Sequence, residues 1–282
     1  MKMKKLARLL STTISSVVCV ATAAEKIVSQ ETMKAIYEEV KTPYKVGMVL
    51  LPEKDECLDD PAVFRHGDAW YMTVVRYVNK GYETHLAKSA DLVLWQRLGC
   101  TLKRGEPGTW DSAQAGGYPC LFDTKWGGSN ALKTFDAKYW MIYLGGDRRG
   151  YEAEPLSNGM ATPPCCSAGN ATRRTPCFVR PIPMRGLTAN AMLQKIDDVW
   201  VMFYFGYLWR PGGAFDTFAC SYDLKNWTKW EGKPLVEPSE SYDKTHAHKP
   251  WVLKHDGVVY HFYCAVGDKG RGIALATSKP IR

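Results

Sequence analysis

SADLVLW, residues 89–95, and SYDLKNW, residues 221–227, carry Ser, Asp, Leu and Trp at the same relative positions. Each stretch closes a longer unit, which begins with DDPAVFRHGDAWYMTVVRY (59–77) in the first copy and with ANAMLQKIDDVWVMFYFGY (189–207) in the second. Both units predict a strand, a turn at Gly or Asp, a second strand, a loop, a third strand and a closing strand after the Trp. The protein therefore repeats a four-stranded unit.

Two further copies of this unit are partial, GGYPCLFDTKWGGSNALKTFDAKYWMIYLGG (116–146) and HKPWVLKHDGVVYHFYCAV (248–266). The aromatic strand recurs at intervals of 70, 60 and 60 residues, at Trp70, Trp140, Trp200 and Tyr260. Large apolar residues stand on both faces of these strands, which predicts that neighbouring sheets cover each strand on both sides.

Four-stranded units that recur about every 40 to 60 residues are typical of a β-propeller, whose blades surround a central channel. We therefore predict an all-β fold of the propeller class with four recognisable blades. Residues 43–58, PYKVGMVLLPEKDECL, are expected to supply a strand that closes the ring against the last blade. An all-β sandwich is the alternative fold, but it does not explain the repeated S-x-D-L-x-x-W. Helical periodicity is confined to residues 31–40, which predict a short surface helix.

The N-terminal segment predicts export. Four basic residues among the first eight precede a mildly apolar run that ends in Ala-Thr-Ala at 21–23, which fits the small-x-small cleavage rule. We predict a signal peptide at residues 1–24 and a single propeller domain at residues 25–282, located in the periplasm or secreted. A buried N-terminal helix and a lipid anchor on Cys19 are the alternatives.

Charge and cysteine content narrow the classes of partner. Removal of residues 1–24, which hold four basic and no acidic residues, lowers the formal net charge from +8 to +4. The remaining basic residues are scattered among acidic ones, which excludes a nucleic-acid patch, and no later apolar run is long enough to span a membrane. The Cys residues after Cys19 form neither a CxxC pair nor a regular disulfide framework. The oligomeric state is not indicated.

The repeats and their flanks resemble the five-bladed propeller glycosidases of the glycoside hydrolase family 43 type, with relatives in families 32, 62 and 130. The resemblance rests on the repeated S-x-D-L-x-x-W and on DDPAVFRHGDAWYM (59–72), AHKPWVLKHDGVVYHFYCAV (247–266) and GIALATSKPI (272–281). It covers residues 36–162 and 187–282 and is closest to exported bacterial members of the group that degrade polysaccharides. The resemblance implies a carbohydrate substrate and a glycosidase.

Glycoside hydrolysis needs two carboxyl groups that flank the scissile bond. In a propeller the innermost strands line the channel, so carboxylates at their starts converge there. The resemblance implies that the first blade supplies the catalytic base, and Asp60, before Pro61, matches it. Asp59 beside it is a candidate for substrate binding. The alternative is an Asp at a turn before Pro with no function.

Two other blades supply candidates. The resemblance implies that Asp111, in the second blade, orients the catalytic acid, and Trp110 beside it is suited to stack on a sugar ring; a loop Asp and a packing Trp are the alternatives. His248 and Lys249 begin the last blade, where relatives place a channel His that contacts sugar. We expect no metal or cofactor, because His246 and His248 share one strand face without a third ligand. A channel calcium ion is the alternative.

The proton donor is harder to assign. The resemblance implies a Glu from a middle blade, but residues 163–186 contain almost no strand pattern and differ abruptly in composition from both flanks. Either a blade is missing, or this segment arose by deletion and a change of reading frame. Glu152 and Glu154 are the nearest substitutes for the acid, and Asn190, where relatives carry an acidic residue, cannot serve.

Three functions follow from these residues. The first is a glycoside hydrolase that acts on a plant or host polysaccharide or oligosaccharide by a two-carboxylate mechanism. The second is a glycoside phosphorylase of the family 130 type, which would need phosphate-binding residues such as Arg76, Arg148, Arg149 or Lys249. The third is a carbohydrate-binding propeller that lacks, or has lost, activity.

Overall fold

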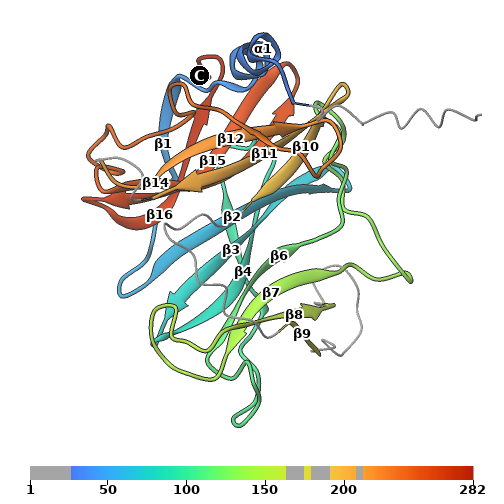
Figure 1. The fold of residues 1–282 in the computed structure, drawn as a ribbon. Coiled ribbons are helices and arrows are strands. Elements are labelled where there is room, and N and C mark those ends of the chain that lie inside the picture. The colour runs from blue at the N-terminus through green and yellow to red at the C-terminus, as the bar shows by residue number, and fades with distance from the viewer. Residues whose placement is uncertain (1–26, 163–174, 179–190, 208–211, 282) are drawn as a thin grey trace, which may run out of the picture.

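The computed structural model describes residues 27–162, 175–178, 191–207 and 212–281. These residues contain sixteen strands and a single helix, α1 (Gln30–Val40), so the all-β prediction is confirmed (Figure 1). The predicted signal peptide, with Cys19, lies outside the described residues, as do Asn190 and most of residues 163–186. No helix of the described part is long and apolar enough to cross a membrane.

The described strands make up four blades, of which the first two are joined into one eight-stranded sheet by a single parallel pair, Tyr82 with Gln114. The first blade contains β2 (Cys57–His66), β3 (Ala69–Val78), β4 (Gly81–Ser89) and β5 (Gln96–Leu102). The second contains β6 (Gln114–Pro119), β7 (Met141–Gly146), β8 (Ser157–Ala161) and β9 (Thr175–Phe178). The third contains β10 (Met192–Ile196), β11 (Val199–Gly206), β12 (Phe215–Ser221) and β13 (Thr228–Lys229). The last contains β14 (His246–His255), β15 (Val258–Gly267), β16 (Gly270–Thr277) and β1 (Tyr44–Leu50).

These blades coincide with the four repeats of the sequence. In three blades the second strand carries the recurrent aromatic residue in equivalent register, because Trp70 pairs with Ser89, Trp200 with Ser221 and Tyr260 with Thr277. In the second blade Trp140 directly precedes β7, so the predicted strand position of this residue is wrong by one residue. A fifth four-stranded unit is absent from the described residues. The prediction that residues 163–186 lack strand structure is wrong at β9, which pairs with β8. An edge strand tolerates the Pro of TPCF because one side of its backbone needs no partner.

The S-x-D-L-x-x-W stretches form two equivalent turns, each between the third and fourth strands of a blade. The Ser89 hydroxyl accepts the backbone N–H groups of Asp91 and Leu92 at 3.1 and 2.9 Å, and Trp95 Nε1 donates to the Leu92 carbonyl at 3.1 Å. In the second copy Ser221 accepts two backbone N–H groups at 3.2 and 2.9 Å. Ser89 and Ser221 therefore cap equivalent turns in the two copies.

The Leu side chain of these turns is buried in one copy only. Leu92 is 1% exposed, whereas Leu224 is 45% exposed. Both residues have positive φ, 67° and 64°. The backbone turn is thus the shared property, and burial of the Leu side chain depends on what lies beside each blade.

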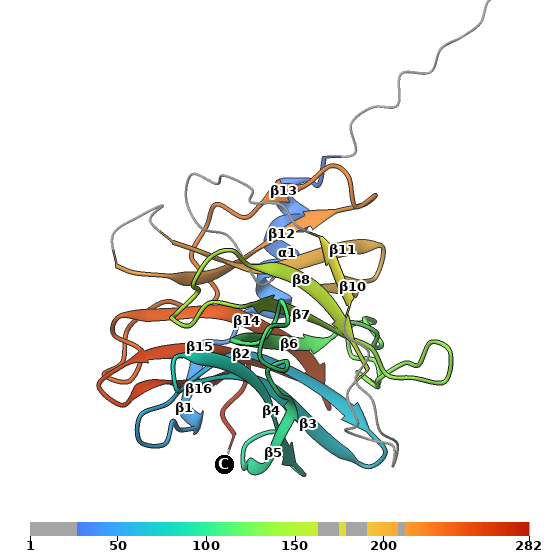
Figure 2. The same ribbon diagram turned by 90° about the horizontal axis from the view of Figure 1, so that it is seen from below.

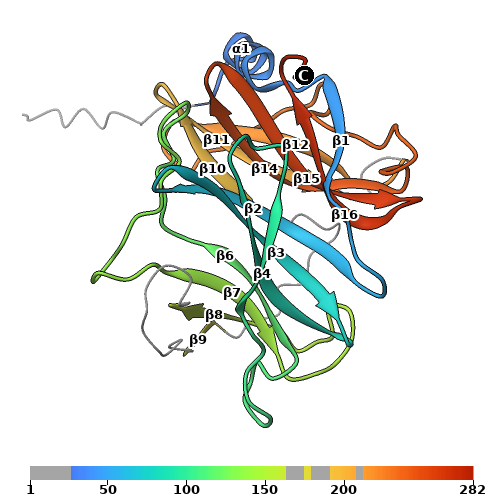
Figure 3. The ribbon, with the colours of Figure 1, turned by 180° about the vertical axis from the view of Figure 1, so that it is seen from behind.

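The last blade joins the two ends of the described protein. β1 pairs antiparallel with β16, as predicted from residues 43–58, and β14 and β16 pack against β2 of the first blade (Figure 3). On its other side β14 packs against β11 and β12 of the third blade (Figure 2). The loop between β6 and β7 reaches the third blade, where the Trp126 backbone N–H donates to the Lys195 carbonyl at 3.0 Å.

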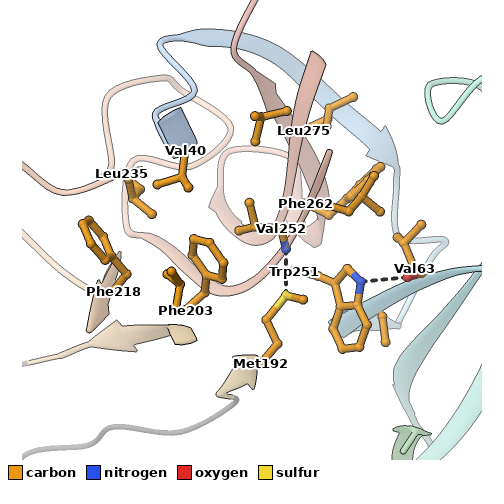
Figure 4. Packing of buried hydrophobic residues seen from close by; sticks show 14 of the residues in the cluster. Val40, Val63, Met192, Phe203, Phe218, Leu235, Trp251, Val252, Phe262 and Leu275 are labelled. Atoms are coloured by element: carbon orange, nitrogen blue, oxygen red, sulfur yellow. Dashed lines mark hydrogen bonds between the residues drawn. The ribbon is translucent and has the colours of Figure 1, made fainter. Parts of the chain in front are cut away.

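The main hydrophobic core lies where the first, third and last blades meet (Figure 4). Trp251 of β14 donates through Nε1 to the Val63 carbonyl of β2 at 2.8 Å, and the next backbone N–H, of Val252, contacts the Met192 sulfur of β10 at 2.8 Å. Helix α1 adds Val40, which is fully buried. Full burial of one such aliphatic or aromatic side chain contributes about 1.5–3 kcal/mol, so this core fixes β14 between its two neighbours.

Candidate active site

Two neighbouring inner strands, β2 and β14, each break their pairing at a residue that precedes Pro. In β2 this residue is Asp60, with φ 47°, before Pro61; in β14 it is Lys249, with φ 62°, before Pro250. Pro has no N–H for the ladder, and the irregularity turns the preceding side chain. Lys249 Nζ consequently lies 3.3 Å from Asp60 Oδ1.

Asp59 is the most strongly paired residue of this site. Its Oδ2 lies 2.9 Å from Lys249 Nζ and 2.7 Å from Arg271 Nη1 of β16, and it accepts the Tyr151 hydroxyl at 3.2 Å. Only 2% of Asp59 is exposed. Burial alone would raise the pKa of this carboxyl, but Lys249 and Arg271 outweigh burial and hold the pKa well below its usual range. Asp59 is therefore a fixed anion.

Asp60 has the opposite character. Burial and the Asp59 charge raise the pKa of the Asp60 carboxyl to about 6, although Lys249 opposes the shift. The Asp60 side chain keeps 19% of its surface exposed. It borders a cavity of about 10 Å³, close to the volume that one water molecule requires. Two adjacent carboxyl groups thus differ in their readiness to exchange a proton.

Glu152 lies on the other side of the same ammonium group, with Oε1 4.0 Å from Lys249 Nζ. It has φ 48°, and its backbone N–H donates to the Tyr82 hydroxyl at 3.2 Å. The Glu152 side chain is 46% exposed. Asp60 and Glu152 therefore face one ammonium, and the partly exposed Glu152 is accessible to a ligand.

Aromatic rings surround this group. Tyr151 is 43% exposed and makes edge-on contacts with Tyr77 and Tyr82 at centroid distances of 5.6 and 5.8 Å. The Arg271 guanidinium lies 5.1 Å from the centroid of the Tyr151 ring. A partly exposed ring, held by two others and by a cation, is suited to stack on a sugar face.

Arg271 and Tyr151 carry no separate signal in the sequence. Arg271 directly precedes the tail segment that resembles the glycosidases, but only pairing of β16 with its neighbours brings the side chain to Asp59. Tyr151 directly precedes Glu152, so its adjacency to that candidate acid was the available clue.

His248 lies close to the carboxylates, 6% exposed, with Nδ1 3.1 Å from the Cys264 carbonyl. Burial lowers the pKa of His248 to about 3, so its ring is neutral. The rings of His246 and His248 are 5.5 Å apart, which confirms that they share one face. Ligand atoms of Asp59, His248 and Cys264 lie within 4.8 Å of one another, so these residues are able to hold a cation.

The remaining predicted residues lie apart from this group. Asp111 is fully buried in the second blade, where its carboxylate accepts the hydroxyls of Tyr143 at 2.8 Å and Thr109 at 2.9 Å. Trp110 packs on Tyr143 and across Gly159, where a Cβ would come within 2.7 Å of the indole. These contacts correspond to the packing alternative weighed for both residues.

Glu154 also lies apart from the carboxylates. It is exposed, and its carboxylate accepts the Leu156 N–H at 3.1 Å, which caps a local turn. Of the two candidates for the missing acid, the structure brings Glu152 to Lys249.

Two larger cavities, of about 720 and 700 Å³, lie elsewhere. The first is lined by α1, residues 123–126 and residues 195–197, and the second by β12 and residues 229–234. Neither is lined by a member of the carboxylate group. The carboxylate group around Lys249 therefore lies outside both of these cavities.

Comparison of the sequence and the fold with known proteins identifies similar solved structures. No family model and no curated protein matches the sequence. The protein is similar to a solved structure of BT0996, named as an RGII complex, with 37% identity, a TM-score of 0.82 and coverage of 90% of the present sequence and 96% of that one. A structure named "Glycoside hydrolase" gives 37% identity, a TM-score of 0.80 and the same coverage. The catalytic domain of a Coprinopsis cinerea GH62 alpha-L-arabinofuranosidase shares the fold alone, with 10% identity, a TM-score of 0.51 and coverage of 85% and 97%.

Proposed function

This protein belongs to the propeller-type glycoside hydrolases, and on this premise we propose that it cleaves a glycosidic bond with Asp60 and Glu152 as its two carboxyl groups. One observation carries this pairing: both carboxyl groups face Lys249 Nζ, at 3.3 and 4.0 Å. Carboxyl pairs in glycosidases are separated by about 5 to 10 Å, and two groups on one ammonium are compatible with that range.

Asp60 takes the role of the base. A catalytic base works best when its pKa is near the operating pH, because it is then ionised and still basic. The raised pKa of Asp60, to about 6, suits this task, and the adjacent cavity is of a size for one water molecule. Asp59 cannot do the same, because Lys249 and Arg271 hold its pKa far below neutrality.

Glu152 takes the role of the acid, and it acts from the exposed side of the site. Lys249 holds Asp60 and Glu152 in place, and Tyr151 offers its ring to a sugar. This chemistry needs no metal cofactor, because Lys249 and Arg271 already supply the positive charges that face Asp59. Activity should accordingly survive treatment with a chelator, whereas a calcium-dependent site would lose it.

The substrate that we propose is a branch of a plant polysaccharide, with RGII oligosaccharides as the first compounds to test, since a relative at 37% identity is named as an RGII complex. Cleavage requires that the enzyme reach an extracellular polymer, which the predicted signal peptide would allow. Sequencing the N-terminus of the protein recovered from the periplasm or medium tests removal of residues 1–24. Recovery in the membrane fraction would instead favour the anchor at Cys19.

The test of the two roles uses two substrates. Asp60→Asn should lower turnover by about 10²–10⁴-fold on both an RGII oligosaccharide and an aryl glycoside with an acidic leaving group. Glu152→Gln should lose turnover on the oligosaccharide but retain it on the aryl glycoside, whose leaving group needs no proton. Glu154→Gln is the matched control and should behave as the wild type. Wild-type turnover in Asp60→Asn, or equal losses on both substrates in Glu152→Gln, would refute the assignment.

Ion pairing counts against two of the four basic residues named for phosphate binding. Arg76 pairs with the buried Glu56, and Lys249 with Asp59 and Asp60, so these cations already have carboxylate partners. Turnover that depends on inorganic phosphate would revive this alternative, and binding without turnover would favour the non-catalytic propeller.

A further inference from the structure

A second group of chemically active side chains lies on the outer half of the first blade. Glu83 and His85 stand two residues apart on β4 and therefore share one face of the strand. Cys100 of the neighbouring strand β5 pairs directly with His85. A carboxylate oxygen, a ring nitrogen and the thiol sulfur of these residues lie within 4.8 Å of one another.

The imidazole of His85 is left without a hydrogen bond at one atom. His85 Nε2 is buried and has no hydrogen-bond partner, and Glu83 Oε2 is 3.6 Å away, beyond hydrogen-bond distance. Buried polar atoms normally have partners, so an exception needs an explanation. Two ligand atoms bound at about 2.1 Å to a tetrahedral ion lie about 3.4 Å apart. The observed separation therefore suits a shared cation better than a direct bond.

The surroundings are organised as the outer sphere of a metal site would be. Arg104 donates to Oε1 of Glu83 at 3.0 and 3.1 Å, so that Oε2 is the oxygen directed to His85. Hydrogen bonds to the far oxygen of a ligating carboxylate orient such ligands. His85 also borders a cavity of about 200 Å³, which gives access to the group.

We propose that Glu83 Oε2, His85 Nε2 and Cys100 Sγ bind a zinc ion, with a water molecule as fourth ligand. Nitrogen and sulfur donors select zinc or a similar borderline cation over calcium and magnesium, which prefer oxygen. Binding forms a zinc–thiolate bond and releases the thiol proton to solvent. The ion would fasten β5, the outermost strand of the first blade, to β4.

The irregular pairing of β4 with β5 is a reason for a metal link between these two strands. The pairing of β4 with β5 is irregular on both sides of His85, between Thr84 and His85 and again between Leu86 and Ala87. Register shifts interrupt the ladder hydrogen bonds, so a link between side chains of the two strands would compensate for them. The Asp59, His248 and Cys264 set is a weaker candidate, because Asp59 already faces Lys249 and Arg271.

Cobalt(II) and zinc titrations of the full, reduced and chelator-treated protein test the proposal. One equivalent of cobalt should give a thiolate-to-metal charge-transfer band, which zinc abolishes by displacement. Cys100→Ser should lose the band, and His85→Gln should weaken zinc binding at least about tenfold. Cys120→Ser, at another partly buried free cysteine, is the control and should bind as the wild type.

A measurement on the wild type makes the result independent of variant folding. Zinc should protect Cys100, and not Cys120, from alkylation, as read by mass spectrometry of the peptides. No charge-transfer band in the wild type, a band that persists in Cys100→Ser, or equal alkylation of Cys100 with and without zinc would each overturn the proposal. Because the ligands are separate from Asp60 and Glu152, a failure here leaves the proposed hydrolysis untouched.

Discussion

Replacement of Asp60 by Asn should make the folded protein more stable at neutral pH while it abolishes hydrolysis. The folded pKa of Asp60 is raised to about 6, above the ordinary value of about 3.9. A carboxyl group with a raised pKa contributes its full stability below the unfolded pKa and loses it as pH rises through the folded pKa. Ionised Asp60 therefore costs stability at neutral pH, and the amide of Asn removes this cost.

The size of the gain follows from the same shift. Each pKa unit corresponds to about 1.36 kcal/mol, so a shift of about two units sets an upper bound of about 3 kcal/mol. Two features reduce the gain: the Asp60 side chain keeps 19% of its surface exposed, and Lys249 loses one ionic partner when Asp60 becomes Asn. Lys249 retains Asp59 at 2.9 Å. We therefore expect an increase of about 1 kcal/mol in the free energy of unfolding at pH 7 to 8.

The assay is urea unfolding of the wild type, Asp60→Asn and Glu154→Gln at unit pH steps from 4 to 8, together with turnover of the aryl glycoside. The stability difference between Asp60→Asn and the wild type should be small at pH 4 and should grow between pH 4 and 6. The wild-type turnover should rise from about pH 5 to about pH 7, with its midpoint near the folded pKa of about 6, as Asp60 ionises. Glu154→Gln should follow the wild type in both measurements, because Glu154 is an exposed local cap.

A stability difference that does not change with pH would refute the assigned titration of Asp60. A less stable Asp60→Asn variant at pH 7 would mean that Lys249 binds Asp60 more strongly than burial and Asp59 disfavour its charge. Full turnover in the stable variant would remove Asp60 from the mechanism while leaving its electrostatics intact.

Three further outcomes are expected. Lys249→Met should lower the free energy of unfolding in chemical denaturation by about 3 kcal/mol, because it leaves Asp59 and Asp60 without their buried ammonium partner. Lys254→Met is the control and should cost less than about 1 kcal/mol, because Lys254 and its partner Glu39 keep 30% and 37% of their side chains exposed. Equal costs in the two variants would contradict this reasoning. Ser89→Ala should lower the free energy of unfolding, measured by thermal unfolding, by about 1 to 2 kcal/mol, because the hydroxyl accepts two backbone N–H groups. A decrease of less than about 0.3 kcal/mol would show that these hydrogen bonds do not stabilise the protein. Tyr151→Ala should raise KM several-fold with little change in kcat, and Tyr151→Phe should restore KM; a fall in kcat alone would argue against stacking of the ring on substrate.

The fold was predictable because its signals are local. Ser89 and Asp91 hold one turn by accepting hydrogen bonds from nearby backbone N–H groups, and the same residue types at the second copy hold another. Such interactions depend on sequence spacing alone, so the repeated S-x-D-L-x-x-W motif identifies the blade unit in the sequence. Exposure of Leu224 was not predictable in the same way, because it depends on the neighbouring segment and not on the turn.

The candidate site was predictable in part. Asp59, Asp60 and Lys249 precede or adjoin Pro at the starts of inner strands, and that position marks them in the sequence. Arg271 lacks such a mark, because it reaches Asp59 only when β16 has joined the last blade and that blade has packed against β2. Contacts between residues 212 positions apart are set by the tertiary fold.

Asp111 is a residue that the sequence places in the candidate site and the structure places apart from it. Its position near the start of an inner strand is similar to that of Asp60, although no Pro follows it. The difference is the direction of the side chain: Asp111 turns into the second blade, where Tyr143 and Thr109 donate to it. Whether a carboxylate faces a channel or a sheet is decided by backbone geometry, which for Asp60 is the positive φ before Pro61.

Packing of the last blade against the first assembles the carboxylate site. β1 holds β16 at the edge of the last blade, β16 carries Arg271, and Arg271 with Lys249 of β14 fixes the charge on Asp59. Asp59, once fixed as an anion, raises the pKa of its neighbour Asp60. The reactivity proposed for Asp60 thus depends on buried ion pairs whose members come from the first and last blades.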